Sequence, residues 1–187
     1  MLESILAAAL AAATAAVCLI SGALAQTVVE IEAVRPTGEV VAGDIVLPDQ
    51  ASGPVPAVML VSGSGAQDRH AAIFEGRYAG HDDWAERLNA AGFAAIRYDE
   101  PGTGESEGNW AETGLFDQKV AVRAILNEAL ADPRVDSERL FVLGHSAGSL
   151  IAMMLSAEDS RFAGLVLAAA PAQPMWEIVE YQNREQA

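Results

Sequence analysis

Apolar residues along the chain gather in short runs that alternate with helical patterns. The two opening runs alternate apolar and polar positions, which predicts a half-exposed hairpin at the edge of a sheet. The later runs are almost wholly apolar and are bounded by glycine, proline or polar residues, which predicts buried strands. The predicted strands are residues 28–34, 39–47, 57–61, 93–98, 140–143 and 162–169.

Two of the predicted helices have clear start and stop signals. Asp83 and Glu86 form a capping-box pattern ahead of an apolar face, and Gly92 closes that helix. Residues 116–130 carry a single apolar stripe, with Asp117 as the predicted N-cap. Both helices are therefore expected to pack one face against a sheet.

The remaining pattern completes an alternation of strands and helices. Residues 149–155 are mostly apolar, which predicts a buried helix, and a further helix begins near Met175. Segments 48–56 and 71–80 are predicted to be surface loops. This alternation indicates an α/β fold, with a mostly parallel twisted sheet and helices on both of its faces.

The first 25 residues differ in composition from the rest of the chain. An alanine-rich apolar run, residues 5–20, precedes a small-residue pattern that ends at Ala25, as at an export cleavage site. Residues 1–25 are therefore predicted to be a signal peptide, and the protein to be periplasmic or secreted. Because Glu3 stands where such signals carry basic residues, an uncleaved membrane anchor is the alternative.

Composition and charge narrow the classes of partner. The chain carries 26 acidic and 11 basic residues, a net charge of -15, which would repel a phosphate backbone and excludes nucleic acid as a partner. Its one cysteine, Cys18, lies within the predicted signal, so no disulfide framework is expected after cleavage. Once the signal is removed, no stable membrane association is expected.

Two glycine-rich loops follow predicted strands. In residues 62–69, two glycines allow a sharp turn that leaves backbone amides exposed, which favours an anion site. A dinucleotide loop would need glycine where Asp68 stands, and the loop at 99–106 fails in the same way at Glu107. We therefore expect no nucleotide cofactor, and the chain has no histidine or cysteine cluster with metal-ligand spacing.

The strongest chemical signal is the sequence Gly144-His145-Ser146-Ala147-Gly148, which follows the strand at 140–143. This G-x-S-x-G spacing is that of a nucleophile elbow, in which a serine on a tight strand-to-helix turn is flanked by small residues that avoid a clash. The free amides at the start of the following helix would favour developing negative charge at the serine.

Three motifs occur in the order of a known superfamily: residues 62–65, residues 97–106 and the elbow. Together they resemble the α/β-hydrolase superfamily, closest to exported bacterial esterase-like or dienelactone-hydrolase-like members. The resemblance covers about residues 28–187. It implies that Ser146 is the nucleophile and that the backbone amides of Ser64 and Ala147 form the oxyanion hole. A serine hydrolase of this kind would act on small-molecule esters or amides through an acyl-enzyme.

The resemblance also implies residues that the chain does not supply. In this superfamily the acid and then the histidine follow the serine, yet His70, His81 and His145 all precede Ser146. These histidines are expected to be ordinary packing or surface residues. We therefore expect residues 26–187 to form an incomplete core domain that is C-terminally truncated, lacks the last strands and helices, and is nearly inactive.

Three further expectations follow from an incomplete core. The last helix would be the start of a lid near residue 175, and the strand at 162–169 would leave an exposed sheet edge through which the chain self-associates. The alternative function is a non-catalytic hydrolase-fold module that binds a ligand above the elbow. A third hypothesis makes His70 or His81 an unconventional base.

Overall fold

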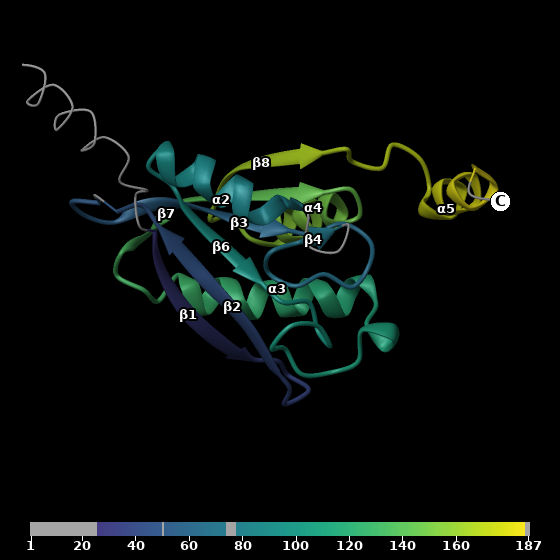
Figure 1. The fold of residues 1–187 in the computed structure, drawn as a ribbon, viewed down its shortest axis with the longest axis horizontal. Coiled ribbons are helices and arrows are strands. Elements are labelled where there is room, and N and C mark those ends of the chain that lie inside the picture. The colour runs from purple at the N-terminus through teal and green to yellow at the C-terminus, as the bar shows by residue number, and fades with distance from the viewer. Residues whose placement is uncertain (1–25, 50, 74–77, 186–187) are drawn as a thin grey trace, which may run out of the picture.

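The computed structural model describes residues 26–49, 51–73 and 78–185, so the predicted signal peptide lies outside the described residues. Six strands form one sheet in the order β1-β2-β6-β3-β7-β8 (Figure 1). Their bounds are β1 Thr27–Val34, β2 Val40–Leu47, β3 Val55–Val61, β6 Ala94–Tyr98, β7 Val135–His145 and β8 Phe162–Ala168.

The sheet is mostly parallel. Strands β6, β3, β7 and β8 run in the same direction, whereas β1 and β2 pair antiparallel with each other and β2 pairs antiparallel with β6. The predicted opening hairpin is confirmed. Of its two strands only β1 lies at a sheet edge, since β2 pairs with β6 on its other side and is almost wholly buried. The predicted α/β fold class is confirmed.

Helices cover both faces of the sheet. On one face, α3 (Leu115–Ala129) and α4 (Gly148–Glu158) bury the larger apolar core, which contains Ile45, Met59 and Ile96. On the other face, α2 (Gly80–Ala90) packs on a smaller core around Val58 and Leu60. This two-sided covering explains why the central strands are apolar at consecutive positions.

Two predicted helix starts are wrong, and each has a physical reason. Helix α2 begins at Gly80 rather than at Asp83, because the first two N–H groups of the helix donate to the carbonyls of Ala71 and His70 instead of to a capping side chain. These carbonyls lie beside a short hairpin of β4 (Ala72–Ile73) and β5 (Tyr78–Ala79), where a loop was predicted.

Helix α3 corrects a second capping prediction. Gly114 is its N-cap, and Asp117 is the third residue of the helix rather than the cap. The Asp117 carboxylate accepts the Gly114 N–H at 3.0 Å, which satisfies a donor just ahead of the helix. Asp117 therefore stabilises the start of the helix from within its first turn and not as the N-cap.

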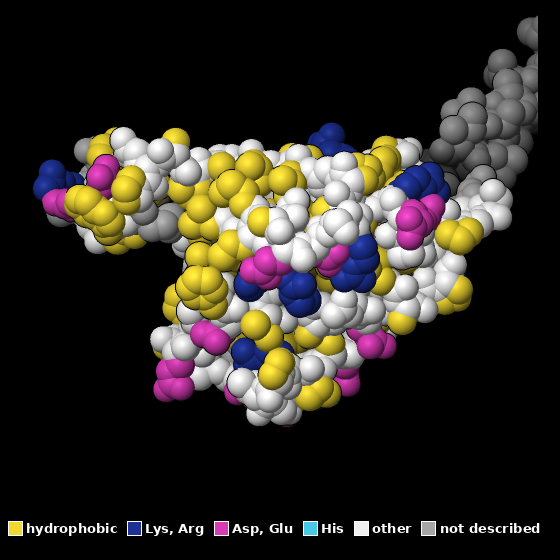
Figure 2. All heavy atoms as spheres, turned by 180° about the vertical axis from the view of Figure 1, so that it is seen from behind, with side chains coloured by type: hydrophobic (Ala, Val, Ile, Leu, Met, Phe, Trp, Pro, Cys, Tyr) yellow, Lys and Arg dark blue, Asp and Glu magenta, His cyan; other side chains and the backbone are white. Residues whose placement is uncertain are grey.

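The edge strand β8 exposes apolar side chains. Leu165, Val166 and Leu167 are 41%, 51% and 40% exposed, and the strand pairs only with β7 in the described sheet. Helix α5 (Met175–Glu185) lies beyond the end of β8, after an extended segment (Figure 1). Its Trp176 is exposed. Figure 2 shows hydrophobic side chains gathered over this part of the molecule. The bare edge is confirmed, whereas self-association through it stays a prediction.

Candidate functional site

Ser146 lies at the sharp turn between β7 and α4. Its backbone φ is +51°, a left-handed conformation that costs a residue with a side chain about 1–2 kcal/mol. Its N–H donates to the carbonyl of Ala168 in β8 at 2.8 Å, so the neighbouring strand holds the turn in place. The turn therefore has the strained geometry that the G-x-S-x-G spacing predicts.

Gly144 and Gly148 make close backbone contacts around this turn. A β-carbon on Gly144 would lie 2.6 Å from the carbonyl carbon of Gly148 and 2.7 Å from the α-carbon of Ser149. A β-carbon on Gly148 would overlap the carbonyl oxygens of Val61 and Ser62, at the end of β3. Both positions require glycine, and the second contact seats the first turn of α4 directly on β3.

The loop of residues 62–67, which follows β3, lies against the elbow. A β-carbon on Gly63 would be only 3.2 Å from the β-carbon of Ser146. Ser64 comes next in this loop, and Ala147 is the N-cap of α4. Among the described residues, no protein acceptor takes the N–H of Ser64 or of Ala147. The three residues selected from the sequence are thus gathered at one end of the sheet.

The three histidines make other contacts. His81 is buried against the ring of Trp84, with centroids 5.5 Å apart, and burial lowers the pKa of its imidazole to about 4. His145 is exposed and meets the edge of Trp84 at 6.3 Å. His70 pairs with Asp82 at 2.8 Å between Nδ1 and Oδ1. Among the described residues, no histidine is hydrogen-bonded to Ser146, and an imidazole with a pKa near 4 is a weak base at neutral pH.

Asp99 fixes the loop that follows β6. Its carboxylate accepts the Arg69 N–H at 2.6 Å and the Glu105 N–H at 3.0 Å, and it pairs with the Arg69 guanidinium at 2.8 Å. Burial alone would raise the pKa of Asp99, but these hydrogen bonds and the Arg69 charge lower it below its usual value. These contacts make the segment a fixed structural turn.

Glu100 is fully buried beside the loop of residues 62–67. Its Oε2 accepts the indole N–H of Trp110 at 3.1 Å and the backbone N–H of Gln67 at 3.4 Å, whereas its Oε1 is buried without a partner among the described residues. Burial raises the pKa of the carboxyl to about 7, and the two hydrogen bonds only partly offset this. Glu100 was not selected from the sequence, because nothing in its neighbours marks it as buried.

We expect Glu100→Gln to stabilise the protein increasingly as pH rises. The folded pKa of about 7 lies above the ordinary 4.5, so folding takes up a proton between these values and wild-type stability falls as pH rises through them. Glutamine removes this loss and keeps an acceptor for Trp110. Urea unfolding should show little difference at pH 4.5 and a gain on the order of 2 kcal/mol at pH 8. The exposed Glu112→Gln is the control, and an equal gain there would contradict the prediction.

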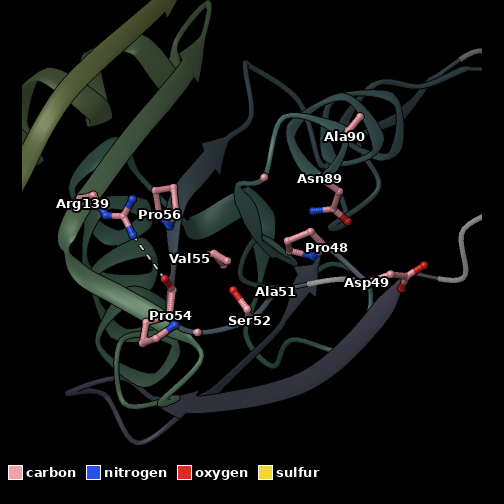
Figure 3. Close-up of a pocket in the computed structure, with 12 residues that line it drawn as sticks. Pro48, Asp49, Ala51, Ser52, Pro54, Val55, Pro56, Asn89, Ala90 and Arg139 are labelled. Atoms are coloured by element: carbon pink, nitrogen blue, oxygen red, sulfur yellow. Dashed lines mark hydrogen bonds between the residues drawn. The ribbon is translucent and has the colours of Figure 1, made fainter.

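A pocket of about 690 Å³ lies at the opposite end of the sheet (Figure 3). It is lined by the loop before β3 and by the end of α2, and Arg139 donates to the carbonyl of Pro54 at 3.3 Å across it. Ligands of open α/β sheets bind at the carboxyl ends of the strands, where Ser146 lies. This pocket is therefore not the candidate active site.

The described residues contain neither a metal-binding cluster nor a membrane-spanning helix. They hold no group of three or more His, Cys, Asp or Glu side chains arranged to bind a metal ion. The helices within the described ranges include none with the length and apolar character needed to cross a membrane.

A mostly parallel sheet with a strained serine turn after β7 is the architecture of an α/β hydrolase. The sequence profile of the family described as "Serine aminopeptidase, S33" (Hydrolase_4) matches residues 74–185. The chain belongs to this family.

Comparison with individual proteins supports the same class. The chain is 34% identical over 140 residues to esterase EstD of Thermotoga maritima, a match that covers 75% of this chain and 32% of the esterase. The solved α/β hydrolase GrgF of Penicillium sp. sh18 superposes with a TM-score of 0.63 at 19% identity, over 86% of this chain and 55% of that one.

An esterase of Pyrococcus furiosus gives a TM-score of 0.64 at 19% identity, over 79% of this chain and 54% of that one. At 19% identity, these solved structures support the assignment of the fold and nothing further. The chain spans about a third of the length of the curated esterase and about half of these two structures.

Proposed function

We propose that the protein is a serine hydrolase that cleaves ester or amide bonds in small molecules through an acyl-enzyme. The observation that carries the proposal is the backbone of Ser146, which is held at φ +51° between two obligatory glycines and against Gly63. A strained serine at this point exposes its hydroxyl at the carboxyl end of the sheet. The family and the esterase relative support hydrolysis as the reaction class.

In the proposed reaction, Ser146 Oγ attacks the carbonyl carbon of the substrate. The N–H groups of Ser64 and Ala147 would stabilise the negative charge on the carbonyl oxygen. The tetrahedral intermediate then collapses, the bond to the alcohol or amine breaks, and the leaving group takes up the proton that the serine lost. Attack by water on the acyl-enzyme releases the acid and restores the serine.

The reaction needs a base for the serine proton, and no histidine follows Ser146 in residues 147–187. We therefore propose that residues 26–187 alone are nearly inactive. Without a complete triad, catalysis would be limited to the roughly 10³–10⁴-fold over water that an oxyanion hole and substrate binding supply. His70 is a poor substitute, since it is paired with Asp82 and shares its pocket with Val28 and Asp44, on strands away from β7.

A fluorophosphonate probe tests the proposed nucleophile in the full-length gene product. Trypsin would release residues 140–161, which contain Ser146, between Arg139 and Arg161. We expect tandem mass spectrometry to find the phosphonyl adduct on Ser146 in native protein and not in heat-denatured protein. An unmodified peptide would reject the proposal and favour the alternative, a non-catalytic module of the same fold. The supporting observation for this alternative is that residues 147–187 contain no histidine.

A further inference from the structure

The loop that carries Ser64 is tied to the loop that follows β6. The carbonyl of Gln67 accepts two hydrogen bonds, one from the Glu100 N–H at 3.1 Å and one from the Thr103 hydroxyl at 2.8 Å. The same hydroxyl also lies 2.9 Å from the carbonyl of Glu100. Gln67 is thus held from the side of β6, whereas the elbow follows β7, on the other side of β3.

The hydrogen bonds continue from Gln67 to Ser64. The Gln67 side-chain amide donates to the carbonyl of Ser64 at 3.3 Å. On the other side, the fully buried Glu100 carboxyl accepts the Gln67 N–H and is itself fixed by the indole N–H of Trp110. A continuous path of hydrogen bonds therefore runs from Trp110 through Glu100 and Gln67 to the carbonyl of Ser64, which is one peptide group along the chain from the Ser64 N–H.

We propose that Glu100 and Thr103 are positioning residues, which act through Gln67 to hold the Ser64 amide in line with the oxygen that becomes negative during attack by Ser146. This inference rests on the proposed function. An oxyanion donor works only if it is already aimed at the developing charge. A displacement of about 1 Å in such a group can cost about 10²-fold in rate. Neither Glu100 nor Thr103 needs to touch the substrate.

Two threonines provide a matched pair of variants. Thr103→Val keeps the shape of the side chain but removes its hydrogen bond to Gln67. Thr113→Val removes a similar hydroxyl, which donates at 2.9 Å to the carbonyl of Asn109 and makes no contact with the loop of residues 62–67 among the described hydrogen bonds. Any effect of losing a hydrogen bond from a threonine hydroxyl to a nearby backbone carbonyl should be common to both variants.

The test measures the second-order rate constant of fluorophosphonate labelling at Ser146 and the final labelled fraction, in the full-length gene product. We expect Thr103→Val to lower the rate constant about 5- to 10-fold, below the roughly 10²–10³-fold loss for removal of an oxyanion donor. The labelled fraction should stay at the wild-type level. Thr113→Val should leave both quantities unchanged.

Glu100 variants separate positioning from folding. Glu100→Ala should lower the rate constant at least about 10-fold, because it frees both Gln67 and Trp110, whereas Glu100→Gln should restore it to near the wild-type value. A variant that merely unfolds part of the protein would reduce the labelled fraction and leave the rate constant of the folded molecules unchanged.

The outcomes distinguish the two hypotheses. If the wild type forms no adduct at Ser146, the proposed function is rejected. If the wild type is labelled but Thr103→Val and Thr113→Val react at equal rates, or Thr103→Val lowers only the labelled fraction, the positioning role is rejected and the proposed function stands.

Discussion

Replacing Ser146 by glycine is expected to abolish covalent labelling and, at the same time, to make the protein more stable. The labelling rate should fall by at least about 10³-fold, since the proposed nucleophilic oxygen is removed. Stability should rise by about 0.5–1 kcal/mol, because glycine occupies a φ of +51° without the steric cost that a β-carbon imposes there. For a chain of this size the gain corresponds to about 1–4 °C in melting temperature.

The control for this prediction is another residue with the same backbone conformation. Ala71 has φ +50° and lies outside the proposed site, so Ala71→Gly relieves a similar strain and should leave the labelling rate unchanged. Its stability gain should be smaller, since a buried methyl group is lost. Thermal unfolding and probe labelling of both variants check the prediction. A Ser146→Gly protein that is less stable than the wild type would show that the backbone conformation of Ser146 does not destabilise the folded protein.

Such an exchange of stability for reactivity is expected where strain is confined to a reacting group. Two neighbouring features sustain the strained turn at Ser146: the hydrogen bond from its N–H to β8, and the seating of α4 on β3 through Gly148. The rest of the core therefore maintains a conformation that the serine would not adopt in a free peptide.

The strands and the elbow could be predicted because their signals are local. Each buried strand is an apolar run, and the three elbow residues Gly144, Ser146 and Gly148 are fixed by spacing alone. The start of α2 could not be predicted, because the acceptors for its first N–H groups come from a hairpin whose pairing leaves no local pattern. Local propensity was overridden there by a tertiary contact.

The hydrogen bonds of the proposed positioning residues could not be predicted for a related reason. Glu100 and Thr103 meet Gln67 across 33 and 36 residues of sequence, and a glutamate is ordinarily expected on the surface. One signal was present: the glycine-rich turn at 99–106 follows a buried strand in a parallel sheet, so its residues had to lie near the other strand-end loops. Adjacency of the two loops was therefore predictable, but not the residues that join them.

The largest loss of stability is expected from Gly148→Ala. The new methyl group would overlap the carbonyl oxygens of Val61 and Ser62 and would lie 2.9 Å from the carbonyl carbon of Val61. These are backbone atoms at the end of β3, which pairs with β7 through Val61 and Gly144 at this level, so they cannot rotate away as a side chain could. The free energy of unfolding should fall by about 3 kcal/mol or more.

The same substitution should also disable the proposed site. Movement of α4 away from β3 separates the elbow from Gly63, so labelling of Ser146 should be lost even in molecules that remain folded. Gly53→Ala is the matched control, because a β-carbon there meets no atom within 4 Å and its stability should change by less than about 0.5 kcal/mol. Urea unfolding of both variants measures the difference. If Gly148→Ala is as stable as Gly53→Ala, α4 is not seated on β3 through this glycine, and the close approach that supports the proposed nucleophile does not exist.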